Sequence, residues 1–243
     1  KLNHYNSTRQ EIERKIFNEA LEKIQNEGNK SNTIVLAGEN WHHGVIGIVS
    51  SKITEMFFKP SILICIEGEN GKGSGRSIPG FDLHDALTRC KDSLEKFGGH
   101  EMAVGLTLKA DKFEEFKNKF EEIAIEEKTS EIVPIINVDG IITLKDLNRK
   151  TIEELKLLEP FGDSNKEPLF VYKNLKIDSI RALTEGKHLK LTLRDINYRI
   201  NAIGFNLGYL VDEYRIGDKI DLVGTIEINS FNGIESIQLN IKD

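Results

Sequence analysis

Two short segments of the chain combine residue types that suit the binding of a phosphate group. Residues 73–77 read Gly-Ser-Gly-Arg-Ser, and residues 98–100 read Gly-Gly-His. Glycine lets a backbone come close to an anion, a serine hydroxyl donates a hydrogen bond, and a guanidinium offers a planar fork of charged donors. In an extended strand Ser74 and Arg76 share one face, so the sequence predicts that they converge on one phosphate.

Both segments also have a purely structural explanation. Glycines within residues 73–77 fit a strand against which a neighbouring backbone or helix packs closely. Residues 98–100 are expected where a helix ends, so the two glycines would form its cap beside an incidental histidine. In the functional alternative, their N–H groups form an anion nest, and His100 holds a phosphate oxygen or steadies the charge that develops during phosphodiester cleavage. The residues alone leave both explanations open.

A third segment contains Trp41, His42 and His43 in succession. A metal site is not favoured there, because adjacent side chains of an extended chain point to opposite faces and no cysteine or carboxylate cluster is near in sequence. We expect instead that Trp41 and His42 line the mouth of a cleft, just before a helix whose first turn, residues 44–47, favours an anion. Trp41 would then be placed to stack on a nucleobase.

These candidate residues are expected to lie on a small sheet with flanking helices. Apolar residues at three- and four-residue spacing predict an amphipathic helix over residues 7–25. Asp82 and Asp111 are suitable N-caps for two later helices, the first of which is expected to close at Phe97 and Gly98. The remaining expected elements are strands over 33–37, 61–66, 72–77 and 102–108 and a helix over 44–57. Helices interleaved with short strands predict an α/β domain.

The pattern changes after residues 126–134, a charged stretch interrupted by proline that we expect to be a domain boundary. Thr151 and Glu154 have the spacing of a capping box for one short helix. Strict alternation over 188–194 and 236–241 predicts strands. About five strands with one helix predict an all-β barrel of the OB type. The expected divisions are an initial helix (1–27), the α/β domain (28–130) and the barrel (131–243).

Four basic residues lie in or beside the strands of the predicted barrel: Lys187, Lys190, Arg194 and Arg199. The ordinary explanation is a solvated strand face. The alternative is a groove that binds a single strand of nucleic acid through these charges, with Phe205, Tyr198 or Tyr209 stacking on bases. The periodicity does not decide between the two.

Composition narrows the classes of function. The 243 residues are 39% apolar and 30% charged, and no apolar run approaches the roughly 20 residues that span a bilayer. The formal net charge is −6, so a nucleic-acid site would have to be a local basic surface. Cys65 and Cys90 are too few for a disulfide framework or a metal site, and buried, reduced thiols fit a cytosolic protein.

Several motifs of the chain together resemble the RecJ family of bacterial single-strand exonucleases. Residues 38–49 (GENWHHGVIGIV), 73–83 (GSGRSIPGFDL) and 97–100 (FGGH) are similar to motifs of its DHHA1 domain. Residues 158–165 (LEPFGDSN) are similar to the segment that leads into its OB domain. The resemblance covers essentially the whole chain.

The chain departs from the family pattern at a few positions. His43 stands where the family usually has proline, and Ser164 and Lys166 replace a usual glycine and proline, which affects local turns. A larger departure is that the Asp-His-His motif of the family's catalytic DHH domain does not occur in the sequence. The resemblance therefore implies the substrate-binding and OB portion of such an enzyme.

The resemblance implies a processive 5′-to-3′ exonuclease that acts on single-stranded DNA in recombination and repair, in the bacterial cytoplasm. The DHH domain of that family binds two Mn²⁺ or Mg²⁺ ions, so the metals would lie outside this chain, and residues 1–27 would end the connector from that domain. Six residues of the DHHA1 domain would hold phosphate, His100 also as an accessory beside the metals: Ser74, Arg76, Ser77, Gly98, Gly99 and His100. The OB domain would bind the trailing strand.

The expected partners are single-stranded DNA, the DHH domain and other repair proteins, with no membrane. We expect the chain by itself to have no nuclease activity. Two other functions are compatible with the residues: a stand-alone nucleic-acid-binding module, and a phosphodiesterase that acts on short oligonucleotides through a DHHA1 domain. The predicted barrel disfavours the phosphodiesterase, because a small substrate needs no strand-tracking barrel.

Overall fold

The computed structural model describes residues 2–28, 30–162, 164–231 and 233–243. The chain forms two compact units, one up to Pro134 and the other from Ile135 onward, which we describe separately. Both cysteines lie in the first unit, where they are buried and unpaired.

The first unit contains a mixed sheet with the strand order β1-β2-β3-β5-β4. Strands β1 and β2 are parallel, and the other neighbours are antiparallel. The helices and strands are α1 (Leu2–Glu27), β1 (Ile34–Gly38), α2 (His43–Phe57), β2 (Ser61–Glu67), β3 (Asn70–Arg76), α3 (Leu83–Arg89), β4 (Lys96–His100), β5 (Ala103–Lys109) and α4 (Phe113–Glu126).

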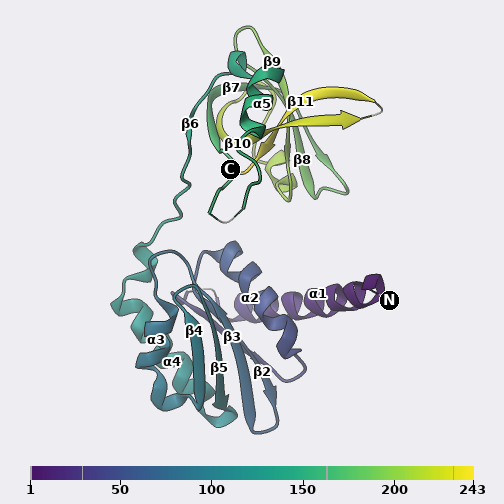
Figure 1. Cartoon of the computed structure of the whole chain (residues 1–243). Helices are drawn as coiled ribbons and strands as arrows, with labels where there is room; N and C mark the ends of the chain where they lie inside the picture. The colour runs from purple at the N-terminus through teal and green to yellow at the C-terminus, as the bar shows by residue number, and fades with distance from the viewer. Residues whose placement is uncertain (1, 29, 163, 232) are drawn as a thin grey trace. The chain divides into compact units, whose positions relative to one another are not determined.

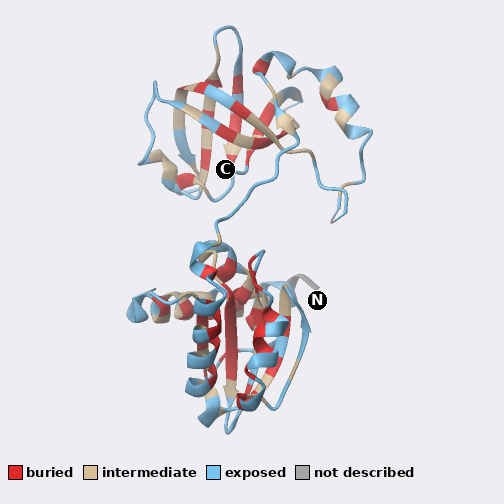
Figure 2. Ribbon diagram, turned by 90° about the vertical axis from the view of Figure 1, so that its left-hand side faces the viewer, coloured by how far each residue is buried: buried red, intermediate tan, exposed pale blue. Residues whose placement is uncertain are grey.

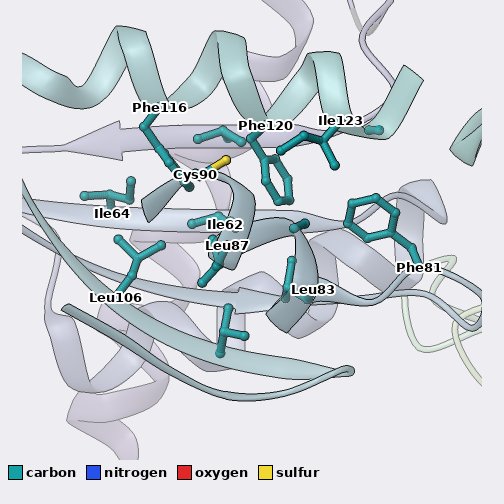
Figure 3. Close-up of a cluster of buried hydrophobic side chains, with 14 of the residues drawn as sticks. Ile62, Ile64, Phe81, Leu83, Leu87, Cys90, Leu106, Phe116, Phe120 and Ile123 are labelled. Carbon is teal, nitrogen blue, oxygen red and sulfur yellow. The ribbon is translucent and has the colours of Figure 1, made fainter. Parts of the chain in front are cut away.

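Helices cover both faces of this sheet (Figure 1). One face carries Leu36 and Leu63, which pack with α1 and α2. The opposite face carries Ile62, Ile64 and Leu106, which pack with α3 and α4 (Figure 3). Buried residues accordingly gather on the central strands and on the inward sides of the helices (Figure 2). The α/β class predicted for this half is confirmed.

Strand β3 presents glycines to one face and polar residues to the other. A Cβ atom at Gly73 would lie 2.8 Å from Leu106, and one at Gly75 would lie 2.9 Å from both Ile62 and Val104. These glycines therefore fit the packing explanation, because no side chain has room on the α3 and α4 side. Their neighbours Lys72, Ser74 and Arg76 lie on the opposite face, as strand alternation requires.

Two expectations about the helices of the first unit are wrong. Helix α3 is capped by Asp82, as predicted, but it ends at Arg89, and the backbone then forms the edge strand β4. Residues 98–100 therefore lie within a strand and do not cap a helix. Long-range contacts end the helix early, because Leu94 and Phe97 pack against the core in an extended conformation and β4 pairs with β5.

The other error concerns the start of α4, whereas α1 agrees with expectation. Helix α1 spans Leu2–Glu27, so it extends beyond the amphipathic stretch 7–25 and agrees with the initial helix expected over residues 1–27. Helix α4 begins at Phe113 with Lys112 at its N-cap, and Asp111 lies in a preceding 3₁₀ turn, so this aspartate does not cap the helix. The 3₁₀ turn over residues 110–112 includes Asp111, so the helix starts one residue later than this cap would require.

The second unit is a sheet with the order β10-β11-β9-β8-β7-β6, and β10 also pairs with β7. That extra pairing nearly closes the sheet into a barrel, which confirms the predicted OB class. The elements are β6 (Gly140–Ile141), α5 (Arg149–Lys156), β7 (Phe170–Leu183), β8 (His188–Arg194), β9 (Arg199–Gly204), β10 (Lys219–Phe231) and β11 (Ile234–Ile241). Its interior is filled by large side chains such as Tyr172, Leu193 and Leu239.

The predicted capping box at Thr151 and Glu154 is wrong. Helix α5 begins at Arg149, and the side chain of Asn148 accepts a hydrogen bond from the Thr151 backbone N–H at 3.1 Å. A capping box is present one turn earlier, between Thr143 and Asp146. Asparagine is a better N-cap residue than threonine, and its position three residues before Thr151 decides where the helix starts.

Candidate nucleic-acid interface

The register of the first sheet brings the two phosphate-type motifs together. Across β3, β5 and β4, Arg76 pairs with Ala103, which pairs with His100. In the next row of the same face, Ser74 pairs with Gly105, which pairs with Gly98. We call this surface the open face, because α2 packs over β2 and β3 while Gly98, His100 and Gly105 are exposed.

Arg76 and Ser74 lie where the open face meets α2. Nη1 of Arg76 donates to the Gly75 carbonyl at 2.8 Å and to Ser74 Oγ at 3.4 Å. A Cβ atom at Gly47 of α2 would lie 2.9 Å from Ser74 Oγ, so the helix passes directly over this pair. Nε and Nη2 of Arg76 have no hydrogen-bond partner among the described residues, which leaves donors of a half-buried guanidinium for a ligand.

The glycines at the open face and within β4 differ in whether a side chain would fit in their place. A Cβ atom at Gly99, whose φ is 140°, would lie 2.2 Å from the Ala103 carbonyl oxygen, so glycine is needed there for backbone pairing. At Gly98 a Cβ atom would meet nothing within 4 Å, and at Gly105 only the Gly73 carbonyl oxygen at 3.9 Å. Packing among the described residues therefore does not account for these last two glycines, which leave a bare strip of backbone beside Ser74.

His100 is exposed at the end of β4, and its Nδ1 accepts from the Met102 backbone N–H at 3.4 Å. In the neutral ring the proton then resides on Nε2, which can donate to a ligand. Ser77, in contrast, is not brought to the open face. It is buried, and its hydroxyl donates to the Phe81 carbonyl at 2.6 Å, so this serine holds the turn after β3.

The prediction for Trp41 is wrong. Its side chain is only 4% exposed and belongs to the core between α1, β1 and α2. A Cβ atom at Gly38 would lie 2.3 Å from the indole ring, which shows how closely the ring covers that glycine. An apolar ring of this size gains more from burial than from exposure at a cleft mouth, and in this position it cannot stack on a base.

His42 is exposed, and its described contacts are with the first residues of α2. Its Nδ1 accepts from the Gly44 backbone N–H at 3.1 Å, which makes it the N-cap of α2, and its ring stacks on His43 with centroids 5.2 Å apart. Histidine is not among the preferred N-cap residues, so the sequence pattern did not reveal this role.

Arg194 and Arg199 of the barrel are both paired with Asp178. Arg194 Nε lies 2.6 Å from Asp178 Oδ1, and Arg199 Nη2 lies 2.6 Å from Oδ2. Burial raises the pKa of Asp178, but hydrogen bonds from the two arginines outweigh it and hold that pKa below its ordinary value. The carboxylate therefore offsets one of the two positive charges, and it fixes both guanidinium groups in place.

The other barrel candidates are accessible. Lys187 is exposed in the turn between β7 and β8, and Lys190 is half-buried on β8, paired across the sheet with Arg181. Phe205 is 52% exposed. Its ring contacts the ring of His188 edge to face, with centroids 5.2 Å apart. Tyr198 and Tyr209 are also exposed. The barrel surface thus combines cations with aromatic rings, the combination that single-strand binding uses.

Three residues of the open face were missed from the sequence: Lys72, Lys96 and Gly105. Lys72 alternates with Ser74 and Arg76, and Lys96 stands two residues before Gly98, so alternation could have found both. Gly105 carries no local signal, because only the pairing of β5 with β3 and β4 places it there.

Family models match both units of the chain. Residues 10–126 match the model described as the DHHA1 domain, and residues 138–243 match the model described as the RecJ OB domain. The chain belongs to the RecJ family. The predicted resemblance is thereby confirmed.

Relatives in this family are considerably longer than the chain. The single-stranded-DNA-specific exonuclease RecJ of Bacillus subtilis is 37% identical over 246 residues, which cover 100% of this chain and 31% of the relative. The Escherichia coli protein of the same name is 32% identical, with 99% and 43% covered. The crystal structure of Thermus thermophilus RecJ in complex with Mn²⁺ superimposes with a TM-score of 0.83 at 27% identity, over 100% of this chain and 35% of that one. The chain thus spans less than half the length of these RecJ proteins.

The described part of the chain offers no ligand set for the metal seen with that RecJ structure. Within residues 2–28, 30–162, 164–231 and 233–243, no group of three or more His, Cys, Asp or Glu side chains is arranged to hold a metal ion. The side chains of the open face are suited to binding an anion, and we assign them no metal. Among the same residues, no helix is both long and apolar enough to cross a membrane.

Proposed function

We propose that this chain is the DNA-binding portion of a RecJ-type 5′-to-3′ single-stranded-DNA exonuclease that acts in recombination and repair in the bacterial cytoplasm. The observation that carries the proposal is the register of β3, β5 and β4, which gathers Ser74, Arg76, Gly98 and His100 on one open face. The names of the RecJ relatives support the choice of single-stranded DNA as the substrate.

In this proposal each group of the open face has a distinct role. Arg76 and Ser74 donate hydrogen bonds to a phosphate at the 5′ end of the strand, since a guanidinium and a hydroxyl there share one face. The bare backbone at Gly98 and Gly105 lets the strand approach closely. Gly99 keeps β4 paired with β5, and Nε2 of His100 offers a further donor to a phosphate oxygen.

The barrel binds the trailing part of the strand. Lys187 and Lys190 neutralise phosphates, and Phe205 provides an exposed ring on which a base stacks. Arg194 and Arg199 contribute less than two unpaired arginines would, because Asp178 shares their charge.

Hydrolysis requires metal chemistry that this chain does not carry in its described residues. We assign the Mn²⁺ or Mg²⁺ ions to a DHH domain, the partner of this chain, where such ions would supply an activated water molecule for attack at phosphorus. This chain binds the strand, orients its 5′ phosphate and keeps its backbone in a fixed track.

The first test is a comparison of two single strands that differ only at the 5′ end. We expect the chain to bind a 5′-phosphorylated oligothymidylate more tightly than the unphosphorylated strand, with affinity that falls as salt rises, by about 0.7 logarithmic units per phosphate neutralised for each tenfold increase in salt. Fluorescence anisotropy titrations over a series of salt concentrations measure both effects. Equal affinity for the two strands would refute the 5′-phosphate role, and the absence of binding at low salt would refute the DNA-binding function.

The second test concerns catalysis. We expect the purified 243-residue chain to release no nucleotides from a labelled single strand in the presence of Mn²⁺ or Mg²⁺, because the open face supplies donors to phosphate and no ligand set for the metals. A full-length RecJ protein serves as the positive control on the same substrate. Metal-dependent degradation by the chain alone would contradict the assignment of catalysis to another domain.

A further inference from the structure

A hollow of about 360 Å³ lies on the first unit beside the residues proposed to hold phosphate. It opens between the start of α2 and the open face. Its lining comes from α2, β3, β4 and β5 and includes His43, Ile46, Lys72, Gly73, Lys96 and Gly105. Nothing in the proposed roles of Arg76 and Ser74 uses this space.

The sheet register fixes where the hollow lies relative to those residues. Lys72 pairs with Thr107, which pairs with Lys96, so these side chains form a third row on the same face. Successive rows are two residues apart along each strand, which is roughly 7 Å. The Lys72 row therefore follows the Ser74 row and the Arg76 row at even steps, and the exposed strip at Gly98 and Gly105 connects them.

The charges around the hollow favour an anionic ligand. Lys72 and Lys96 stand at opposite ends of its row, and both are exposed. The amino end of α2 also borders the hollow at His43, and this end of a helix carries a partial positive charge. The one carboxylate described in contact with this group is Glu67, whose Oε2 lies 3.5 Å from Lys72 Nζ and whose Oε1 lies 4.0 Å from His43 Nδ1.

Between the two lysines the lining is largely uncharged. Ile46 forms one wall, and the floor includes the backbone at Gly73 and Gly105, where no side chain projects. A nucleoside has matching properties, because its sugar and base are bulky and uncharged while the phosphates on either side of it are anionic. The hollow therefore fits one nucleotide unit of a strand better than it fits a free anion.

We propose that this hollow is a second subsite for the single strand: it receives the sugar and base of the nucleotide whose phosphate Arg76 and Ser74 hold, and Lys72 and Lys96 bind the neighbouring phosphate. The inference rests on the proposed function, because it takes single-stranded DNA as the ligand. It adds a direction to that function, since the strand then runs along β3 from the Arg76 row to the Lys72 row.

The first experiment separates this subsite from the 5′-phosphate site. We expect the double variant K72Q/K96Q to bind a 5′-phosphorylated oligothymidylate roughly tenfold more weakly at low salt and to show a shallower salt slope. Its preference for the phosphorylated over the unphosphorylated strand should stay as in the unchanged chain, because Arg76 and Ser74 are intact. Lys119→Gln, on α4 at the other face of the sheet, is the matched control and should leave affinity unchanged.

Replacing Glu67 is expected to strengthen binding of the single strand, the opposite of the effect expected for K72Q/K96Q. Glu67→Gln removes the negative charge beside Lys72 and His43, so we expect affinity for the single strand to rise by roughly two- to fivefold. A structural defect would not produce tighter binding. Unchanged affinity in both Glu67→Gln and K72Q/K96Q, together with an unchanged preference for a 5′ phosphate, would overturn the subsite and leave the proposed function standing.

The second experiment tests whether a nucleoside occupies the hollow. Gly105→Val places a branched side chain in it, at a position where the backbone has room for a Cβ atom, which meets only one oxygen at 3.9 Å. We expect this variant to weaken binding of an intact strand severalfold and to have a smaller effect on a strand whose 5′-terminal nucleotide is abasic. Equal weakening of the two strands would overturn occupancy by the base, whereas failure of the unchanged chain to bind either strand would refute the proposed function itself.

Discussion

Arg76→Ala is expected to weaken binding of a 5′-phosphorylated single strand by about 1–3 kcal/mol, roughly 5- to 150-fold, and to abolish the preference for the phosphorylated end. The guanidinium lies half-buried at the edge of α2, where only Nη1 has described partners and the remaining donors are available to a phosphate. A charged hydrogen bond at such a partly desolvated position is stronger than one in open solvent. Anisotropy titrations with the phosphorylated and unphosphorylated strands measure both effects.

Two further variants interpret this result. Arg89→Ala removes the same charge from α3, where the arginine pairs with Glu126 and Glu127, and should change affinity little. Arg76→Lys keeps the charge but loses the planar fork, so it should recover the salt dependence without recovering the full preference for a 5′ phosphate. If Arg76→Ala retains both the affinity and the salt slope of the unchanged chain, Arg76 is not a phosphate contact.

Phe120→Ala is expected to lower the free energy of unfolding of the first unit by about 3–5 kcal/mol. Phe120 is fully buried and meets Phe81 edge-on and Phe116 face-on, with ring centroids 5.8 Å apart in each pair (Figure 3). Its removal leaves a large cavity in the core between the sheet and α4. Trp41, the single tryptophan of the chain, is buried in this unit, so its fluorescence during denaturant titration follows the unfolding of this unit.

The matched variant lies in the barrel. Leu193→Ala removes a fully buried side chain from the second core and should cost about 2–5 kcal/mol there. We expect it to lower the denaturant midpoint of the transition that far-ultraviolet circular dichroism reports for the barrel. The midpoint reported by Trp41 fluorescence should stay unchanged. An equal shift of the Trp41 transition in both variants would mean that the two units unfold as one.

The class of each half could be predicted from periodicity, but several element ends could not. The alternating residues 188–194 predicted β8 correctly, because one face of that strand is buried in the barrel. Residues 94–100 gave no strand signal, since two adjacent glycines have low strand propensity, and only pairing with β5 makes them extended. Local patterns also misplaced the starts of α4 and α5, where a neighbouring turn or a better cap decides the boundary.

The candidate site, too, could be predicted from the sequence only in part. Alternation predicted that Ser74 and Arg76 share a face, and their described contact agrees with that prediction. The pairing of Arg76 with His100 through Ala103 depends on two long-range strand contacts, which no local pattern encodes. Burial of Trp41 and the neutralising role of Asp178 were unpredictable for the same reason, because each depends on residues distant in sequence.

The alternation within β3 has a consequence for how this surface can change. Glycines 71, 73 and 75 fit against the core only because they lack side chains, and their neighbours Lys72, Ser74 and Arg76 lie on the open face. A slip of one residue would turn Lys72, Ser74 and Arg76 into the apolar core and expose the glycines instead. The strand therefore has a single workable alignment, which holds Lys72, Ser74 and Arg76 at fixed spacings, so in the proposed complex any adjustment to different DNA would come from the parts of the protein around β3.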